Sequence, residues 1–125
     1  MKPITIISFG YLHGVRPKAD ITIDLRQLLS DPAHVPQGDM LDMTGLSKEV
    51  HDFVFNTPGV HALTHSIFYL TVLAAQLKPV TLAIGCAGGR HRSVVFAEKI
   101  SWLLSGVGYE TKPYHLHIHL PRIIK

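Results

Sequence analysis

Short runs of apolar residues, some alternating and some continuous, predict several strands along the chain. β-branched residues dominate segments 4–9 and 20–25, which predicts two strands joined by a loop. Segment 79–85 is apolar throughout, a pattern typical of a central strand covered on both faces. Segment 109–120 alternates between apolar and polar residues and therefore predicts a half-exposed strand.

Helical spacing predicts two helices before the central strand and one after it. Ser47 is a good N-cap for a short helix that Pro58-Gly59 ends. A longer helix follows to about residue 77. Its predicted apolar face consists of Leu63, Ile67, Leu70, Leu73, Ala74 and Leu77. With a third helix over 93–104, the pattern predicts an α/β fold in which about three helices flank a small mixed sheet of about four strands.

A long stretch without periodicity separates the second strand from the first helix. Residues 26–46 contain Pro32, Pro36, Gly38 and Gly45, which predicts an ordered loop instead of a further element. Loops of this length inside a small domain usually line a site.

Length and composition narrow the class of protein. With 125 residues, the chain has the size of one domain, so we expect a single domain over 1–125. Apolar residues make up 46% and charged residues 17% of the chain. The sequence contains no run of about 18 apolar residues, the length that is needed to span a bilayer. No signal-peptide pattern is present and Cys86 is the single cysteine, so we expect a cytoplasmic protein without disulfides or a multi-cysteine zinc site.

The most informative motif, Gly-Cys-Ala-Gly-Gly-Arg-His-Arg-Ser, occupies residues 85–93 and connects the central strand to the third helix. A helix that begins there directs free backbone N–H groups and the positive end of its dipole at one point. Gly88 and Gly89 let a ligand approach the backbone, and Arg90 and Arg92 carry forked donors for phosphate oxygens. The motif therefore predicts a phosphate-binding loop, against the alternative of a turn with solvated arginines.

The same loop also has the Cys-x-x-Gly-x-x-Arg-Ser spacing of cysteine phosphatases, formed by Cys86, Gly89, Arg92 and Ser93. In that chemistry a thiolate attacks phosphorus while the arginine holds the oxygens, so Cys86 and Arg92 would be the catalytic residues. Gly85 stands where these enzymes usually have histidine. The general acid stays open among Asp24, Asp39 and Asp42, and a packing role for the cysteine is the alternative to nucleophilic attack.

Several segments together resemble one known family. The turn at 8–11 (Ser-Phe-Gly-Tyr), the Asp-Leu-Arg at 24–26, the segment 41–46 with its Thr-Gly, and above all residues 85–94 resemble the C-terminal domain of the RNase adapter protein RapZ. The resemblance covers nearly the whole chain in the same order. The kinase-like domain that precedes it in full-length members has a Gly-x-x-x-x-Gly-Lys-Ser/Thr motif, which this sequence lacks, so we expect a stand-alone domain without nucleotide hydrolysis.

The resemblance implies that the domain binds an amino-sugar phosphate, glucosamine-6-phosphate, and a small regulatory RNA that it presents to an endoribonuclease. It implies no cofactor. The ligand-binding residues that it and the loop chemistry suggest are His13, Asp24, Arg26, Cys86, Ala87, Gly88, Gly89, Arg90, His91, Arg92, Ser93 and His115. The resemblance also implies that the protein forms a homo-oligomer.

Other features leave alternatives open. His115, His117 and His119 share one face of the predicted last strand, so a divalent metal is one interpretation; polar residues facing water or RNA are the favoured one, and no metal is predicted. His91 either binds phosphate, which we favour, or caps the third helix. A net charge of +3 is compatible with RNA but does not require it. The basic residues that would contact RNA phosphates are Arg16, Lys18, Lys112, Arg122 and Lys125.

Overall fold

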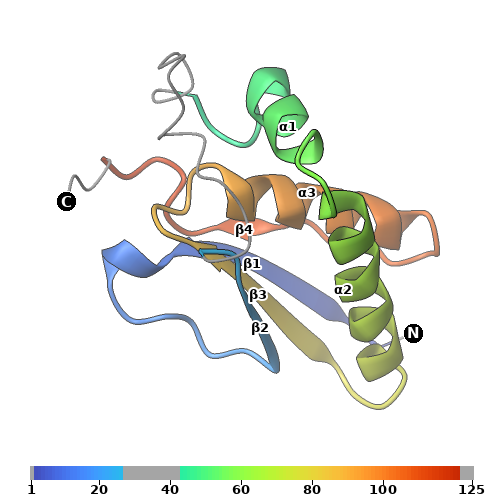
Figure 1. The fold of residues 1–125 in the computed structure, drawn as a ribbon. Helices are drawn as coiled ribbons and strands as arrows, with labels where there is room; N and C mark the ends of the chain where they lie inside the picture. Colours follow the sequence, from blue (N-terminus) through green and yellow to red (C-terminus); the bar gives the residue numbers. More distant parts are fainter. Residues whose placement is uncertain (1, 27–42, 122–125) are drawn as a thin grey trace.

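The computed structural model describes residues 2–26 and 43–121, and in them a parallel sheet carries helices against one face (Figure 1). The elements in chain order are β1 (Ile4–Gly10), the 3-10 helix η1 (Tyr11–His13), β2 (Ile21–Asp24), α1 (Lys48–Phe55), α2 (Val60–Ala75), β3 (Val80–Cys86), α3 (Arg92–Ser105) and β4 (Tyr114–His115). The strand order is β2-β3-β1-β4. The predicted α/β class is confirmed, with four strands and three α-helices in the described residues.

All three strand pairings are parallel, whereas the sequence analysis expected a mixed sheet. β1 and β3 pair along their whole lengths, from Ile4 opposite Val80 to Gly10 opposite Cys86. The carboxyl ends of β1 and β3 therefore meet at one edge of the sheet, next to the start of α3 (Figure 1). This edge is where ligands bind in open parallel sheets.

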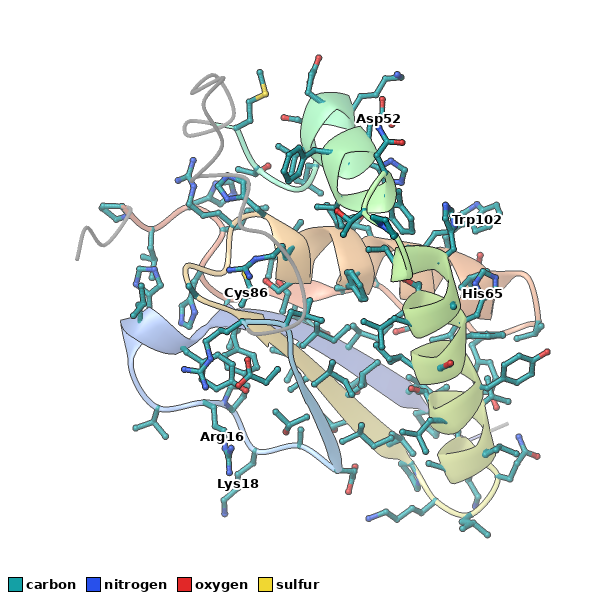
Figure 2. The ribbon with its side chains drawn as sticks, in the orientation of Figure 1. Arg16, Lys18, Asp52, His65, Cys86 and Trp102 are labelled. Atoms are coloured by element: carbon teal, nitrogen blue, oxygen red, sulfur yellow. The ribbon has the colours of Figure 1, made fainter. Side chains whose placement is uncertain are left out.

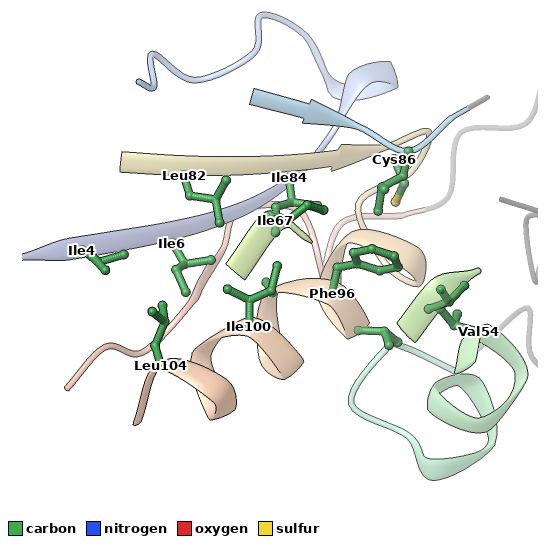
Figure 3. Packing of buried hydrophobic residues seen from close by; sticks show 14 of the residues in the cluster. Ile4, Ile6, Val54, Ile67, Leu82, Ile84, Cys86, Phe96, Ile100 and Leu104 are labelled. Carbon is green, nitrogen blue, oxygen red and sulfur yellow. The ribbon is translucent and has the colours of Figure 1, made fainter. Parts of the chain in front are cut away.

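The core lies between the sheet and the helices. Ile6, Leu82 and Ile84 point from the strands toward Phe96 and Ile100 of α3, and all five are fully buried (Figure 3). Burial of apolar side chains at about 25 cal/mol per Å² is the main force that holds α3 to the sheet. Because α3 is held along its length, the position of its first turn relative to β1 and β3 is determined as well.

The buried face of α2 differs from the predicted one. Ile67 is buried as expected, but Leu70, Leu73 and Leu77 are 48, 65 and 83% exposed. The face toward the core consists of Val60, Thr64, Ile67, Thr71 and Ala75. Threonine can occupy this face because each hydroxyl donates to the carbonyl four residues earlier, at 2.7 and 2.8 Å.

This difference predicts unequal costs for two similar truncations in α2. Ile67→Ala removes a side chain that is 3% exposed, so we expect it to lower the free energy of unfolding by about 2–4 kcal/mol. Leu73→Ala removes a 65% exposed side chain and should change it by less than about 0.5 kcal/mol. Urea denaturation followed by circular dichroism measures both values. Equal losses would contradict the observed orientation of α2.

The last predicted strand, 109–120, is also different. Only Tyr114 and His115 form strand β4, and residues 116–119 turn, with the Leu120 N–H donating to the His117 carbonyl at 3.2 Å. The side chains of His115 and His117 bond to β1 instead of facing solvent. Two of the polar positions in the alternating segment 109–120 are therefore histidines that bind residues of β1.

Candidate anion-binding site

The loop between β3 and α3 lies where the sequence placed it, and the figure labels Cys86 at its start (Figure 2). The N-cap residue of α3 is His91, whose side chain makes no capping hydrogen bond. Its Nε2 lies 2.8 Å from the Met43 carbonyl and donates to it. The backbone N–H groups of the first turn of α3 are therefore not capped by the His91 side chain, as an anion site requires.

Two glycines allow the loop to pack against the end of β1. Gly89 has φ of 75°, which other residues rarely adopt. A Cβ on Gly10 would lie 2.6 Å from the Gly88 carbonyl oxygen and 2.7 Å from the Gly89 nitrogen. The backbones of β1 and the loop thus approach more closely than any side chain permits.

A third glycine holds the loop from the other side. The Gly45 N–H donates to the Arg90 carbonyl at 2.6 Å, and a Cβ on Gly45 would lie 2.6 Å from the His91 carbonyl oxygen. The segment before α1 therefore lies directly against the loop. Residues 27–42 of the predicted long loop, including Asp31, Asp39 and Asp42, lie outside the described residues.

Cys86 is only 2% exposed, and its sulfur contacts two polar groups. Its Sγ lies 3.1 Å from the Ser93 Oγ and 3.3 Å from the Gly89 nitrogen, which donates to it. An anionic sulfur would accept hydrogen bonds from both groups. The predicted spacing of Cys86, Gly89 and Ser93 thus brings these three residues into contact.

Arg92 connects the loop to the segment after β2. Its side chain is buried, and Nη1 donates to the Leu25 carbonyl at 3.3 Å. Leu25 is itself held by its N–H, which donates to the Gly85 carbonyl at 2.8 Å. The structure therefore brings Asp24 and Arg26, which flank Leu25 in the chain, to the same edge of the sheet as the loop.

Asp24 and Arg26 form a forked ion pair at this edge. Nη2 of Arg26 lies 2.7 Å from Oδ2 of Asp24, and Nε lies 3.0 Å from Oδ1. This hydrogen bonding from Arg26 lowers the pKa of Asp24 below its usual value, more than partial burial raises it. The guanidinium also lies 3.7 Å from the ring centre of Tyr11, whose pKa is raised, first by burial and then by the charge of Asp24.

The histidines occupy two different environments. His115, predicted to approach the ligand, lies 2.6 Å from Ser8 Oγ through Nδ1 and 2.8 Å from Glu98 Oε2 through Nε2. His117 instead reaches the loop: its Nδ1 accepts from the Gly10 N–H at 2.8 Å, and its ring lies against that of His13 at 4.8 Å between centres. Over residues 2–26 and 43–121, no group of histidines, cysteines and acidic residues is arranged to hold a metal ion.

The predicted RNA-binding residues that the structure describes, Arg16, Lys18 and Lys112, do not form one cluster. Arg16 and Lys18 lie on the exposed loop between η1 and β2 and point away from the sheet (Figure 2). Lys112 precedes β4, the edge strand on the opposite side of the sheet from β2. Arg122 and Lys125 lie outside the described residues.

Sequence reasoning missed three residues that shape the site, namely Gly10, Gly45 and His117. The sequence shows Gly10 and Gly45 only as turn or loop glycines, and no local signal indicates that a distant backbone packs against them. The alternating pattern places His117 in a row of histidines predicted to face solvent. Its position between two glycines of separate segments follows only from the pairing of β4 with β1.

Comparison with known proteins identifies the family of this chain. The family model of the RapZ C-terminal domain matches residues 2–119. The chain belongs to the RapZ C-terminal domain family. Proteins named "nucleotide-binding protein" are similar to this RapZ-type chain: one from Streptomyces griseus is 38% identical over 117 residues, 89% of this chain and 34% of its own length. One from Desulforapulum autotrophicum is 39% identical over 123 residues, 92% of this chain and 40% of its own length.

The RapZ C-terminal match accounts for only part of these relatives. The chain spans about a third to two fifths of the length of the curated relatives that it matches. No helix in the part of the chain that the structure describes is long and apolar enough to cross a membrane.

Proposed function

We propose that this RapZ C-terminal domain binds a phosphorylated small molecule of the amino-sugar phosphate class, with glucosamine-6-phosphate as the first candidate. The supporting observation is the loop at 86–91, which packs through glycine residues against β1. The loop ends at the start of α3, where the side chain of the N-cap residue His91 makes no capping hydrogen bond. A helix start directs its backbone N–H groups and the positive end of its dipole at one point, and an adjacent buried arginine adds a positive charge, so the two together favour a multiply charged anion.

Each part of the ligand would meet a different part of the site. The phosphate would lie against Gly88, Gly89 and the first turn of α3, with Arg92 as a forked donor. The amino group of the sugar would lie toward Asp24, whose lowered pKa keeps its carboxylate charged at neutral pH. The relatives' name indicates nucleotides for those whole proteins, and a nucleotide also presents phosphate, so nucleotides are the competing ligands.

Isothermal titration calorimetry with a panel of ligands tests this proposal. The panel contains glucosamine-6-phosphate, glucose-6-phosphate, glucosamine, nucleoside mono- and triphosphates, and inorganic phosphate. We expect the amino-sugar phosphate to bind more tightly than either the sugar without phosphate or the phosphate without amine. Equal affinity for glucose-6-phosphate would show that Asp24 does not bind the amino group of the ligand. Tighter binding of a nucleotide would show that the ligand is a nucleotide and not an amino-sugar phosphate.

A second candidate function is phosphomonoester hydrolysis by Cys86, favoured by the contacts of its sulfur with Gly89 and Ser93. The thiolate would attack phosphorus, the ester P–O bond would break, and the leaving alkoxide would take a proton from an acid; water would then hydrolyse the thiophosphate. A histidine does not fit before the cysteine, because a Cβ on Gly85 would lie 2.6 Å from Tyr11 Cε2.

Cys86→Ser distinguishes binding from hydrolysis. If the domain is an enzyme, hydrolysis of para-nitrophenyl phosphate should fall at least about 100-fold in this variant while ligand affinity persists. If the domain only binds, as we propose, neither protein should release para-nitrophenol above the buffer rate. Turnover by the wild-type protein that survives in Cys86→Ser would indicate a contaminating phosphatase.

Contact with RNA in a regulatory adapter role is the further part of the proposal. It rests on the exposed cations Arg16 and Lys18 on the loop after η1. Such contacts weaken steeply as salt rises, so gel shifts with a structured RNA at low and high salt test them. Loss of binding in an Arg16→Ala/Lys18→Ala double variant would support this surface, and no shift at low salt would contradict it.

Self-association also stays a prediction. A second copy would pack on the apolar side chains that α2 and the turn after it expose, namely Tyr69, Leu70, Leu73 and Leu77. Light scattering after gel filtration measures the mass. A monomer at all concentrations would contradict the prediction.

A further inference from the structure

His117 lies at the point where β1 and the anion-binding loop pack most closely. Its Nδ1 accepts the Gly10 N–H at 2.8 Å, and its Cβ lies 3.0 Å from where a Cβ on Gly89 would be. His117 is therefore held against both glycines, Gly10 through its ring and Gly89 through its Cβ, and the remaining ring nitrogen, Nε2, is the atom with which it can bind a ligand.

The hydrogen bond from Gly10 determines the protonation state of His117. A backbone N–H can only donate, so Nδ1 must carry its lone pair, and the proton of the neutral ring is on Nε2. Burial lowers the pKa of His117, and the charge of His13 lowers it further. Both effects favour a neutral ring that donates from Nε2.

His13 is the second imidazole beside the loop. The rings of His13 and His117 lie 4.8 Å apart between centres, and among the described residues the buried Nε2 of His13 has no hydrogen-bond partner. The 3-10 helix that carries His13 is tied to the loop, because the Leu12 N–H donates to the Ala87 carbonyl at 3.0 Å. An anion on the loop would therefore lie beside an imidazole that can accept a proton.

Three other charged side chains, on the loop, on α3 and after β2, are held by hydrogen bonds or an ion pair. On the loop, Nη1 of Arg90 donates to the Leu120 carbonyl at 3.4 Å, which brings a cation to the segment after β4. On α3, the Glu98 carboxylate bonds to His115. Just after β2, Arg26 pairs with Asp24.

We propose that His13 and His117 form one wall of the anion site. Binding of a phosphate or sulfate dianion is accompanied by the uptake of one proton, which His13 takes from solvent. Neutral His117 donates to the anion from Nε2, and no bond to phosphorus forms or breaks. The inference rests on the proposed function, because it requires that the loop bind an anion. Its consequence is that affinity rises as pH falls.

Calorimetry with sulfate and with glucosamine-6-phosphate between about pH 6 and 8 measures this linkage. Sulfate stays a dianion throughout, whereas a phosphate ester has a second pKa near about 6, so sulfate reports protons taken up by the protein alone. We expect up to one proton per bound sulfate, seen as a binding enthalpy that depends on the ionisation enthalpy of the buffer. Affinity should rise at most about tenfold per pH unit.

Two variants separate the roles of the rings. His13→Gln should abolish proton uptake and flatten the pH dependence, whereas His65→Gln, on the exposed face of α2, should change neither. His117→Asn keeps an acceptor for the Gly10 N–H but loses the Nε2 donor, so the affinity should fall about tenfold while proton uptake persists. Thermal melts confirm that the variants are folded.

Long-range ¹H–¹⁵N NMR spectra of the wild-type protein test the assignment without any substitution. They should show a neutral His117 with its proton on Nε2, and a His13 that becomes protonated when sulfate is added. Binding with no proton uptake would overturn this inference and leave the proposed function intact. Proton uptake that persists in His13→Gln would overturn the role of His13, and absence of binding by both probes would overturn the inference and the proposed function together.

Discussion

Arg92→Ala is expected to weaken the binding of glucosamine-6-phosphate by at least about 100-fold, a loss of about 2.7 kcal/mol. Hydrogen bonds to charged groups contribute about 1.5–3 kcal/mol each, and Arg92 carries a fork of such donors at the start of α3. Calorimetry at constant ionic strength measures the loss.

The control for Arg92 must remove one positive charge without touching the site. Lys2→Ala does so, because Lys2 is exposed and precedes β1, at the opposite end of the strand from Gly10. Since Arg92 is buried and bonds to the Leu25 carbonyl, Arg92→Lys is the second variant: it keeps the charge and loses the fork. If Arg92→Ala is folded by its thermal melt and binds as tightly as the wild-type protein, the loop is not the site.

Gly10→Ala is expected to have the second large effect, on stability and binding together. The added methyl group would lie 2.6 Å from the Gly88 carbonyl oxygen and 2.7 Å from the Gly89 nitrogen, and these are backbone atoms, so no flexible side chain can move aside. Overpacking of this kind costs about 1–3 kcal/mol in the free energy of unfolding. Because the loop must move to relieve the clash, affinity for the phosphorylated ligand should fall with it.

Gly88→Ala is the matched control, since it adds the same methyl group within the loop. A Cβ there meets no atom within 4 Å, and Gly88 does not have positive φ. We therefore expect unchanged stability or a small gain from reduced flexibility of the unfolded chain, within about 1 kcal/mol. Urea denaturation compares the two variants. A Gly10→Ala protein as stable as Gly88→Ala would show that β1 and the loop are not packed as closely as described.

The elements that sequence predicted correctly are those with strong local signals. β3 was predicted by a continuous apolar run, and α1 by its N-cap Ser47. The connection of β3 to α3 through residues 86–91 was also predicted, because a glycine-rich motif after a buried strand has few other structures. These signals are local, so they can be read along the chain.

The predictions that failed depended on which neighbour an element meets. α2 is apolar over much of its circumference, and its spacing allowed a leucine face that the structure leaves exposed. Thr64 and Thr71 face the core because their hydroxyls bond within the helix, and no pattern of hydrophobicity reveals that. Similarly, the alternation over 109–120 said nothing of the bonds from Ser8 and Gly10 to two of its histidines.

By itself, the sequence determined the family, the α/β class, and the position of the loop at 86–91, because a glycine-rich motif between a buried strand and a helix acts over a few adjacent residues. Only the tertiary structure decided what surrounds that loop. Gly10, Gly45 and His117 come to it from three separate segments, through parallel strand pairing and backbone contacts that distant residues make. Such contacts are determined by the packing of the whole sheet against α3, which no segment encodes alone.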